Sequence, residues 1–475
     1  MIEQELINQA KNRIQEYYEL QKEGLINLKG TFFPSVHYPP ITMYPPIKEK
    51  ALFKDYKNPT DNLFDIYVHI PFCIKYCNFC HYPIKIKASS EEKDYYLDML
   101  EKEIDIYLNR LGYSRINGRA ILIGGGTPTH LSPCQLSRFL KSFSKRVEMS
   151  TCTQFSYDVD PTTLLGEEGR EKLKIMKDYG VDRLTIGIQS FNDRTLKIMN
   201  RAHNAKEAVE SVQRSKKMGY KVNLEFIYGY ISQSLEQWMD TIKKAVSLEV
   251  DEIQFYQLKV IPYGDHNGLV LKEYDIKTEE FPKKERTLMM KSLAISYLTQ
   301  NGYSENLTRV FSRTKQDYSH YADNQCCKLF SQLGFGLTGF SSLHDRFGLN
   351  TLSLKRYYAM IEQGKLPVDR GLVRNEDDQL RWGIILPLKN REVLKKYYQR
   401  LTGISLDKIF RKKISRLKEF NLLYENEVML KLTPLGRFFA DEVCHQFHHP
   451  RFMPFPKDEY AEGKLYPFDN YKPYA

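Results

Sequence analysis

Residues 65–85 read DIYVHIPFCIKYCNFCHYPIK, a short apolar segment followed by a loop that carries three cysteines. The segment 65–70 predicts a β-strand that Pro71 ends. Cys73, Cys77 and Cys80 follow with the spacing C-x3-C-x2-C, just past the carboxyl end of that strand. The other cysteines are scattered along the chain, so this tight group indicates metal or redox chemistry rather than a disulfide framework.

Two kinds of metal site fit three thiolates on one loop. Structural zinc normally takes four closed ligands, so one alternative is a zinc knuckle completed by His81 or His69. The other is a cubane iron–sulfur cluster held by the three cysteines, with one iron left open to bind another molecule. The loop by itself leaves both alternatives open.

A repeated strand–helix pattern surrounds the cysteine loop. Helical patterns include residues 91–111 and residues 168–180, the second ending at Gly180. The strand candidates cover 65–70, 120–123, 154–159, 183–188, 222–228 and 252–258. This alternation predicts parallel strands in a barrel or a doubly wound sheet. In parallel barrels functional residues gather at the carboxyl ends of the strands, which is where the remaining motifs fall.

Three further motifs follow strand candidates. Residues 121–129, ILIGGGTPT, place three glycines at a strand end, where glycine lets backbone approach a ligand closely. Asp158 and Asp160 flank Val159 at the next strand end, as a ligand-binding pair or as an ordinary helix cap. The third motif is the run 183–191, RLTIGIQSF, with residues 200–203, NRAH, and the strand 222–229, VNLEFIYG.

Together these motifs resemble the radical S-adenosylmethionine (SAM) superfamily, and within it the HemN-like branch, named after oxygen-independent coproporphyrinogen III oxidase. The resemblance is closest over residues 67–258. It implies an α/β fold, a partial (β/α)6 TIM-type barrel open on one side. It also implies a [4Fe-4S] cluster whose open iron binds SAM. An electron from the cluster cleaves SAM in this superfamily, and the 5′-deoxyadenosyl radical released takes a hydrogen atom from the substrate.

The resemblance also assigns roles to residues. The cluster ligands correspond to Cys73, Cys77 and Cys80. Contacts to the cluster-bound SAM correspond to Tyr67, Gly125, Gly126, Thr127 and Asp158. The branch can hold a second SAM, whose contacts correspond to Phe79, Gln189, Arg201 and Glu225. Tyr67 and His69 are the candidate catalytic residues.

Structural alternatives stand beside three of these assignments. Tyr67 also fits a core aromatic residue. His69 also fits a buried, hydrogen-bonded histidine. Arg201 could pair bidentately with a ligand carboxylate or form a salt bridge with Glu225 at the barrel rim.

Several positions depart from the pattern of the branch. Asp158 stands where the branch more often has Glu, and Glu225 where it has Asp. His81-Tyr82 follows the third cysteine, where coproporphyrinogen oxidases have Gly-Cys. Residues 320–330, HYADNQCCKLF, replace the HNxxYW-like run of the haem chaperones.

With these departures the chain resembles the class C methyltransferase and anaerobic haem-degrading members of the branch more closely than the true coproporphyrinogen oxidases. That resemblance implies C-methylation or a related transfer on a tetrapyrrole-like or planar aromatic small molecule. The alternatives are oxidative decarboxylation of the coproporphyrinogen oxidase type and a non-catalytic haem-binding carrier with the same fold. Modification of tRNA is less favoured because no RNA-binding module is evident.

The remaining segments suggest the domain organisation. We expect an N-terminal helix and a Pro- and aromatic-rich arm (1–60), the barrel (61–300), an extension with a Gly-rich loop (301–370), a small C-terminal helical/winged domain (371–445) and an extended tail (446–475). The arm and tail could form a stacking lid over a planar substrate. Cys326 and Cys327 could ligate a second cluster or face the substrate, and the other scattered cysteines are expected to be structural.

Composition sets the broad class. The chain has 475 residues, 42% hydrophobic and 27% charged, which suits a globular protein of two or three units. No apolar run is long enough to cross a bilayer, and the start lacks the apolar stretch of a secretory signal, so we expect a cytoplasmic protein. The net charge of +11 suits substrate carboxylates or a solvated basic surface. A flavodoxin- or ferredoxin-type protein is the expected electron donor, and neither a membrane nor a nucleic acid is an expected partner.

Overall fold

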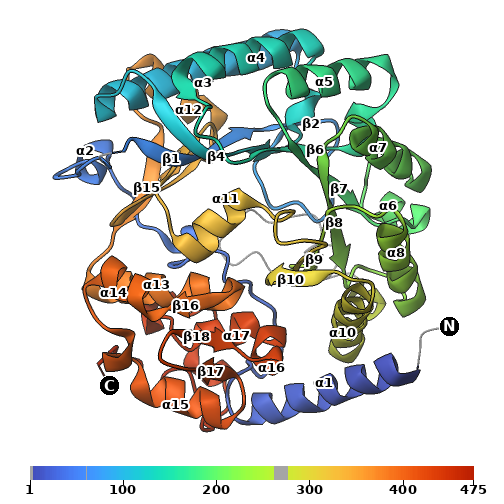
Figure 1. Cartoon of the computed structure of the whole chain (residues 1–475), viewed down its shortest axis with the longest axis vertical. Coiled ribbons are helices and arrows are strands. Elements are labelled where there is room, and N and C mark those ends of the chain that lie inside the picture. The colour runs from blue at the N-terminus through green and yellow to red at the C-terminus, as the bar shows by residue number, and fades with distance from the viewer. Residues whose placement is uncertain (1–3, 60, 261–276, 475) are drawn as a thin grey trace.

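Six parallel strands form the centre of the molecule (Figure 1). The computed structural model describes residues 4–59, 61–260 and 277–474. The strands are β1 (Leu63–Ile70), β4 (Ile116–Gly125), β6 (Phe155–Val159), β7 (Arg183–Gln189), β8 (Lys221–Tyr228) and β9 (Glu252–Gln257). They lie side by side in chain order, as in a singly wound barrel. All six predicted strands are therefore confirmed.

Helices from the intervening segments cover the outer face of these strands (Figure 1). They are α3 (Ser90–Leu111), α4 (Pro133–Arg146), α5 (Gly166–Asp178), α6 (Asp193–Ile198), α7 (Ala205–Lys217) and α8 (Leu235–Ser247). Local sequence fixes their ends. Ser89 accepts a hydrogen bond from the backbone N–H of Glu92 and the Glu92 side chain accepts from Ser89, while Gly112 ends α3 at a φ of 72°.

The two faces of the barrel strands differ in chemistry. On β8 the side chains of Val222, Leu224 and Phe226 are buried in the core beneath the helices, whereas Asn223 and Glu225 alternate with them and so lie on the inner face. Parallel strands covered by helices on both faces are apolar throughout. Here helices cover only the outer face, so the inner wall is free to be polar and to carry chemistry.

Further strands extend both edges of the barrel sheet without closing it. β12 (Gln332–Phe335) pairs in parallel with β1 and leads to β13 (Phe340–Leu343), β14 (Arg346–Asn350) and β15 (Val368–Val373), while β11 (Val310–Ser312) and β10 (Ser304–Leu307) extend β9. Among the described residues no strand pairing joins β10 to β15. The partial barrel is thus open, as predicted.

The Gly-rich loop expected in the extension 301–370, at residues 333–341, belongs in part to the sheet. Its first residues belong to β12, and Gly334 lies so close to the backbone of Phe340 that a Cβ would overlap it. The glycines let the chain fold tightly from β12 into β13. Their role is therefore packing, and the sequence pattern alone did not show this.

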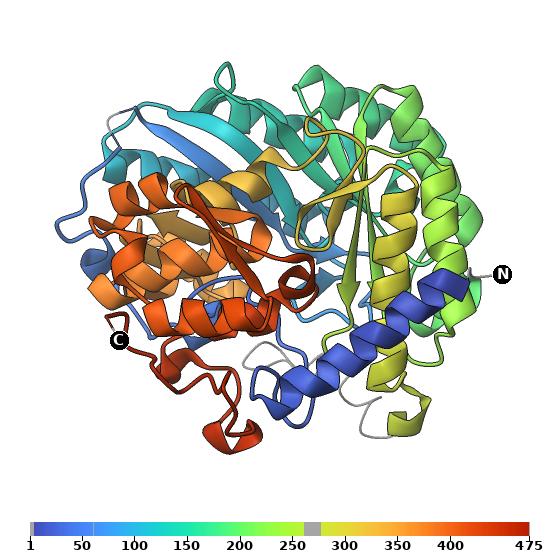
Figure 2. The same ribbon diagram turned by 60° about the horizontal axis from the view of Figure 1, so that its bottom comes forward.

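The C-terminal segment has the topology of a winged helix. It contains α13 (Glu376–Asn390), β16 (Glu392–Leu394), α14 (Lys395–Thr402), α15 (Arg411–Glu419), β17 (Leu423–Glu425), β18 (Met429–Leu432), α16 (Pro434–Phe438) and α17 (Ala440–His445). The three short strands pair in the order β16-β18-β17. In the segment expected to be helical and winged, the hairpin β17–β18 forms the wing, and α16 and α17 follow it. This segment lies across the open side of the sheet (Figures 1 and 2).

The N-terminal helix α1 (Gln4–Lys22) lies beside α10 (Lys284–Gln300), as Figure 2 shows. The Ser296 hydroxyl donates to the Gln9 side chain across this contact at 3.2 Å. A helix over residues 1–20 was predicted; its first three residues lie outside the described part of the chain.

The aromatic arm and tail pack against each other. Phe33 of the arm is buried with Met453, Phe455 and Tyr460 of the tail. Tyr38 is fully buried, and the centre of its ring lies 6.0 Å from the centre of the Phe452 ring. These rings form a small core of their own. The expectation that they form an open stacking lid is wrong for these residues, because their faces are already covered.

One buried carboxylate joins four separate segments. Asp441 of α17 pairs with Arg309 next to β11 at 3.2 Å and with Lys389 of α13 at 2.8 Å. It also accepts a hydrogen bond from the backbone N–H of Ser35 in the arm at 2.8 Å. Burial opposes ionisation, but the two cations lower the pKa of Asp441 well below its usual range. The junction therefore ties the arm and the winged segment to the barrel.

Removing this charge should loosen the junction. We expect Asp441→Asn to lower the free energy of unfolding by about 2–5 kcal/mol at pH 7, because it leaves two buried cations without their counter-charge. The control is Asp240→Asn, an exposed change on α8 that should stay within about 0.5 kcal/mol of the unmodified protein. Urea unfolding followed by circular dichroism measures both. Equal stability of the two variants would contradict the proposed junction.

Candidate active site at the mouth of the barrel

The three cysteines lie on a loop just beyond β1. Cys73 ends the short strand β2 (Phe72–Cys73), which pairs in parallel with β3 (Lys85–Ile86). The Asn78 side chain donates to the carbonyl of Ile198 at 2.9 Å, and the Asn200 side chain donates to the carbonyl of Tyr76 at 2.8 Å. These bonds fix the loop to the end of α6. All three thiols are half-buried and free of disulfides.

Polar groups face two of the thiols. The Thr127 hydroxyl donates to Sγ of Cys73 at 3.6 Å, and Nη1 of Arg201 donates to Sγ of Cys77 at 3.2 Å. Burial raises the pKa of Cys73 to about 12 and that of Cys80 to about 11. Buried thiolates therefore need a compensating positive charge, and bound iron supplies one.

The contacts do not favour the zinc knuckle. Nδ1 of His69 lies 3.0 Å from the hydroxyl of Tyr67, and Nε2 of His81 lies 2.9 Å from the carbonyl oxygen of Lys259. Within the described residues, no three His, Cys, Asp or Glu side chains converge closely enough for a single ion. A cubane places its three thiolates on three different irons, so it does not require such convergence.

The glycine run lies against the first cysteine. A Cβ on Gly126 would lie 2.8 Å from Sγ of Cys73, and one on Gly124 would lie 2.5 Å from Oδ2 of Asp158. Gly125 has a φ of 118°, where side chains are strained. The run thus forms a cradle that any side chain would fill. Gly126 and Thr127 lie against Cys73, and Gly125 lies against His69 and Ile70 at the end of β1. Their contact with SAM stays a prediction.

Tyr67 and His69 form a pair on the inner face of β1. His69 is 1% exposed, and burial lowers its pKa to about 3. Its Nδ1 also lies 3.3 Å from the Thr338 hydroxyl. A histidine in this state is neutral at pH 7, so the geometry favours the buried, hydrogen-bonded alternative over a proton donor. His69 positions the hydroxyl of Tyr67. The Tyr67 ring lies beside Gly124 and faces the space bounded by the inner faces of the six barrel strands, which is called the chamber below.

Carboxyl groups crowd the inner wall next to Tyr67. Asp158 on β6 and Glu225 on β8 both lie on this wall. The strand between them is β7, where Thr185 is in register with Asp158 and Gly187 with Glu225. Burial and then the charge of Glu225 raise the pKa of Asp158 to about 8. Deeper in the barrel, Arg183 forms a buried ion pair with Glu252. The carboxyl group of Asp158 on this wall therefore keeps its proton near neutral pH.

Three of the four residues predicted for a second SAM converge. A Cβ on Gly187 would lie 3.2 Å from Gln189, 3.7 Å from Arg201 and 4.0 Å from Glu225. Phe79 lies on the cysteine loop and packs edge-on against Tyr230, with ring centres 6.4 Å apart. Gln189, Arg201 and Glu225 thus gather around a residue that has no side chain, and their role in binding a second SAM stays a prediction.

The expected rim salt bridge has a different partner. Nη2 of Arg201 pairs with Asp160 at 2.7 Å, while the carboxylate of Glu225 accepts from the Gln254 side chain. Asp160 also caps the turn at 161–164 by accepting from the backbone N–H of Thr162. Burial opposes the ionisation of Asp160, but Arg201 lowers its pKa below the usual range. The alternative of an Arg201–Glu225 pair is therefore corrected to Arg201–Asp160.

Sequence reasoning missed three tyrosines that share the chamber with Tyr67. The Tyr321 ring lies 6.5 Å from that of Tyr67. Tyr82, 62% exposed, is close enough to raise the pKa of both Tyr67 and Tyr256, although burial is the larger cause for each. Tyr256 lies two residues after the inward-facing Gln254 on β9. That alternation was the one signal that could have found it.

Cys326 and Cys327 lie on a single π-helical turn (Asn324–Lys328), and both are half-buried. Cys326 is near Tyr321, so it lies on the chamber side of this turn. Burial raises the pKa of Cys326 to about 11. A role of the two cysteines as ligands of a second cluster or as substrate contacts stays a prediction.

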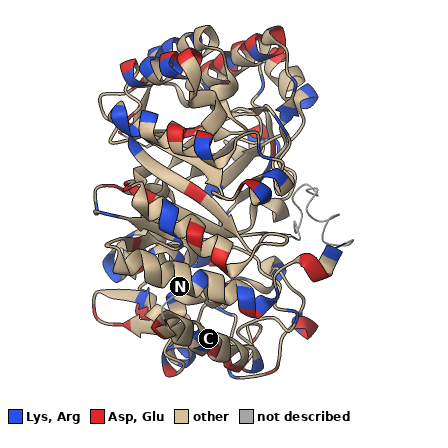
Figure 3. Cartoon of the chain, turned by 90° about the vertical axis from the view of Figure 1, so that its right-hand side faces the viewer, with Lys and Arg blue, Asp and Glu red and all other residues tan. Residues whose placement is uncertain are grey.

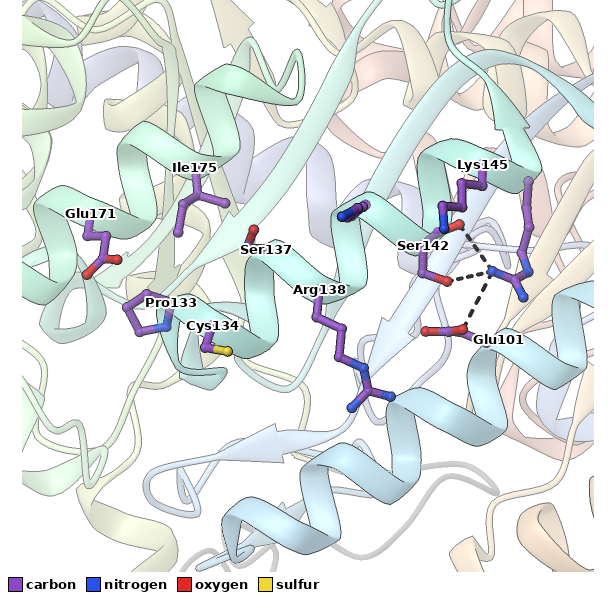
Figure 4. Close-up of a pocket in the computed structure, with 11 residues that line it drawn as sticks. Glu101, Pro133, Cys134, Ser137, Arg138, Ser142, Lys145, Glu171 and Ile175 are labelled. Atoms are coloured by element: carbon purple, nitrogen blue, oxygen red, sulfur yellow. Dashed lines mark hydrogen bonds and ion pairs between the residues drawn. The ribbon is translucent and has the colours of Figure 1, made fainter.

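A separate groove lies on the outside of the barrel, between α3, α4 and α5 (Figure 4). Its volume is about 900 Å³, and residues that line it include Glu101, Cys134, Arg138, Lys145 and Glu171. Arg138 pairs with Asp94 at 3.1 Å, so part of its charge is already balanced. On the face in Figure 3, basic and acidic residues are interspersed over the outer helices. Neither feature marks a second active site.

Comparisons with known proteins agree with this geometry. The profile of the Radical SAM superfamily matches residues 67–245. The haem chaperone HemW of Bacillus subtilis (strain 168) is 27% identical over 80% of this chain and 98% of its own length. The oxygen-independent coproporphyrinogen III oxidase of Escherichia coli (strain K12) is 27% identical over 72% of this chain and 74% of its own.

The structure of the E. coli coproporphyrinogen III oxidase HemN, a radical SAM enzyme, superposes with a TM-score of 0.70. It covers 82% of this chain and 90% of its own at 24% identity. Residues 67–245 therefore form a radical SAM domain. Within that superfamily it is HemN-like, with relatives among both the coproporphyrinogen oxidases and the haem chaperones. None of the described helices is both long and apolar enough to cross a membrane.

A [4Fe-4S] cluster and SAM are the cofactors of this superfamily, and the residues at the barrel mouth fit them. The donor set consists of three thiols on one loop, and the glycines beside Cys73 let the backbone approach the loop more closely than any side chain would allow. Nε of Arg201 and the amide of Asn223 are buried on the inner wall without hydrogen-bond partners among the described residues. Such groups need polar partners, and a bound polar ligand supplies them.

The glycine cradle can be tested by adding one methyl group. We expect Gly126→Ala to reduce iron bound after anaerobic reconstitution to less than about half of the unmodified level, because the Cβ displaces Cys73 and the backbone of Phe72. Gly187→Ala is the control, since its Cβ comes within 3.4 Å only of the flexible end of Gln189 and meets Arg201 and Glu225 at ordinary contact distances of 3.7 and 4.0 Å. Iron assay and circular dichroism report loading and folding. Full loading of the Gly126 variant would contradict the assigned cradle.

The protonated carboxyl on the wall predicts a pH effect on stability. With a pKa of about 8 against 3.8 in the unfolded chain, Asp158 holds a proton in the folded state that the unfolded state releases. Stability of the cofactor-free protein therefore falls as pH rises from about 4 to 8. Asp158→Asn removes this effect and should be more stable at pH 8 by roughly 1–4 kcal/mol, with a smaller gain at pH 5. Urea unfolding at both pH values measures the gain; an equal gain would argue against the raised pKa.

Proposed function

We propose that this protein is a radical SAM enzyme that starts radical chemistry, most simply a C-methylation or related transfer, on a tetrapyrrole-like or other planar aromatic molecule. The observation that carries the proposal is the sharing of one barrel mouth by the cysteine loop, the glycine cradle and a set of tyrosines. The cofactors, when bound, supply the radical that removes a hydrogen atom from the substrate. The remaining steps depend on the residues that surround it.

The glycine cradle and Tyr67 would hold the SAM beside the cysteine loop. Gly126 and Thr127 lie against Cys73, and the hydroxyl of Tyr67 is oriented by His69. Asp158, with its raised pKa, is placed to hydrogen-bond a ligand either as a neutral carboxyl or as a carboxylate. The positive sulfonium and ammonium groups of SAM favour the carboxylate.

The tyrosines would hold a flat substrate. Tyr82 and Tyr256 expose 62% and 40% of their surfaces, far more than most aromatic residues of the barrel. Exposed aromatic faces stack favourably on planar rings, and their hydroxyls add polar anchors at the edge. A substrate in this position lies next to the cradle, where a radical generated on bound SAM can reach it.

The cluster of Gln189, Arg201 and Glu225 around Gly187 offers a place for the second SAM that methyl transfer requires. A second SAM held there would donate the methyl group while the first provides the radical. In the oxidative decarboxylation alternative, the same arginine would instead anchor a substrate propionate. In the carrier alternative, the chamber binds haem and SAM is not consumed. The relatives include both an oxidase and a haem chaperone, so both alternatives belong in the test.

Product analysis separates these activities. The reconstituted protein is incubated anaerobically with SAM, dithionite and either haem or coproporphyrinogen III. Methyl transfer yields 5′-deoxyadenosine together with S-adenosylhomocysteine and a methylated product. Decarboxylation yields 5′-deoxyadenosine and carbon dioxide without S-adenosylhomocysteine. Haem binding without 5′-deoxyadenosine would overturn the enzyme proposal in favour of the carrier.

The cysteine assignment is tested by a matched pair of variants. We expect Cys77→Ala to abolish the absorbance of the cubane and to reduce 5′-deoxyadenosine formation at least about 100-fold, since no other thiol can replace it on the loop. Cys134→Ala, on the outer surface of α4, should retain both. Retention of the cluster by the Cys77 variant would refute the three-cysteine site.

A further inference from the structure

Tyrosines lead from the chamber through the wall of the barrel. The hydroxyl of Tyr67 lies 3.0 Å from Nδ1 of His69, and the carbonyl oxygen of His69 accepts a hydrogen bond from the hydroxyl of Tyr96 at 2.7 Å. Burial is the main cause of the raised pKa of Tyr96, and the nearness of Tyr67 is a smaller one. Tyr96 belongs to α3, which covers the outer face of the strands. A single residue, His69, therefore connects a tyrosine of the chamber with a tyrosine outside it.

Ring contacts continue this series between α3 and α12 (Leu354–Glu362), which lie side by side (Figure 1). The Tyr96 ring stacks on that of Tyr357, with ring centres 5.5 Å apart, and its centre lies 6.4 Å from that of Tyr358. The Tyr358 ring in turn lies 4.9 Å from that of Tyr95. Tyr96 and Tyr357 are fully buried, whereas Tyr95 is 38% exposed. The series thus runs from the chamber wall to the surface through adjacent rings.

Hydroxyls along this series face groups that can accept a proton. The Tyr357 hydroxyl donates to the carboxyl of Glu103 at 2.6 Å, and the Tyr95 hydroxyl donates to Glu362. Tyr67 faces His69, whose pKa burial lowers to about 3, so that its imidazole is neutral at pH 7. A phenol gives up an electron more readily when its proton can move to such a group. Phenylalanine would serve packing alone and would bury no hydroxyl.

We propose that Tyr67, Tyr96, Tyr357, Tyr358 and Tyr95 form an electron path that quenches a stray radical in the chamber when no substrate is bound. The inference rests on the proposed function, because a chamber needs such an exit only if a radical is generated in it. The path is an addition to the proposed reaction and takes no part in it when the substrate is in place.

The steps conserve atoms and electrons. Tyr67 gives the hydrogen atom of its hydroxyl to the 5′-deoxyadenosyl radical: the O–H bond breaks, a C–H bond forms, and Tyr67 becomes a phenoxyl radical. An electron then passes along the path from Tyr95 to Tyr67, Tyr67 takes up a proton from solvent, and Tyr95 passes its own proton to Glu362. A thiol in solution restores Tyr95 by giving it a hydrogen atom, and Glu362 releases its proton to solvent. The thiol is left as a thiyl radical outside the protein.

A cofactor-free protein tests the path without any activity. Cys80 is kept as the attachment site for a ruthenium photo-oxidant, while Cys73, Cys77 and Cys134 are replaced by alanine, and peptide mapping confirms the labelled residue. A flash then creates an electron vacancy at the mouth of the chamber. A nitroso spin trap in solution marks the tyrosines at which the radical reaches the surface, and mass spectrometry locates the adducts. We expect Tyr95 to be marked, although it lies outside the barrel.

A matched pair of phenylalanine variants shows whether the route runs through Tyr96. We expect Tyr96→Phe to reduce the Tyr95 adduct at least about fivefold. Tyr107→Phe is the control, because Tyr107 is buried on the same helix but has Phe53 and Phe335 as ring neighbours. It should change the adduct by less than about twofold. Circular dichroism checks that both variants fold. Equal amounts of the Tyr95 adduct in the two variants would overturn the path.

Substrate-free turnover of the reconstituted protein tests the same path in operation. In D2O with SAM, dithionite and glutathione, we expect one deuterium in most of the 5′-deoxyadenosine, because a phenol hydrogen exchanges with solvent. Tyr67→Phe should lower the deuterated fraction at least about fivefold. Tyr95→Phe should form the first 5′-deoxyadenosine normally but accumulate a tyrosyl EPR signal at least about fivefold stronger. Tyr18→Phe is its control, since Tyr18 is 40% exposed and also donates to a glutamate, Glu285, but on α1.

The outcomes separate the path from the proposed function. Formation of 5′-deoxyadenosine without deuterium, or equal tyrosyl signals in the Tyr95 and Tyr18 variants, would overturn the path and leave the proposed function standing. Absence of 5′-deoxyadenosine under all conditions would overturn the proposed function. The adducts of the cofactor-free protein then decide by themselves whether the tyrosines conduct.

Discussion

The imbalance of buried charge inside the barrel constrains much of the rest of this structure. Asp158, Asp160, Glu225 and Glu252 line the chamber, and in the described part of the chain the guanidiniums that face them are Arg183 and Arg201. Burying carboxylates is unfavourable unless each has a counter-charge or a proton. Arg183 and Arg201 balance two of them, and Asp158 keeps a proton. A cationic ligand such as SAM is the complementary occupant of this wall.

This constraint also explains why helices leave the inner face of the barrel sheet uncovered. A polar inner wall cannot be packed against a second layer of apolar helices, so helices cover only the outside, and the winged segment lies across the open side instead. That arrangement needs its own anchor. Asp441, held by Arg309 and Lys389, is a buried charge cluster of the same kind, at the opposite boundary of the chamber.

Local sequence patterns predicted most of the fold and the cysteine loop. The six strands were readable because each places apolar residues on its outer face between helix signals, and the loop because three cysteines fall within eight residues. Contacts between distant segments were not readable. The pairing of Arg201 with Asp160, the approach of Tyr321 to Tyr67 and the conversion of the Gly-rich segment into β12 depend on register and on neighbours brought together by folding. Which side of the cysteine loop faces the chamber also depends on where folding places β9.

Two departures from the pattern of the branch acquire a physical meaning in this setting. Asp158 is one methylene shorter than the usual Glu, and Glu225 is one methylene longer than the usual Asp. The two lie on strands that flank β7 and interact electrostatically, and Gly187 leaves space between them. The exchange preserves the number of carboxyl groups while moving their charge by about one C–C bond toward β6. Because Gly124 has no room to spare beside Asp158, a longer Glu there would have to push into the chamber. The shorter Asp158 side chain enlarges the space beside the glycine run, and the longer Glu225 side chain narrows the space around Arg201. We expect a chamber changed in this way to bind the same cofactors and to accept a different molecule next to them.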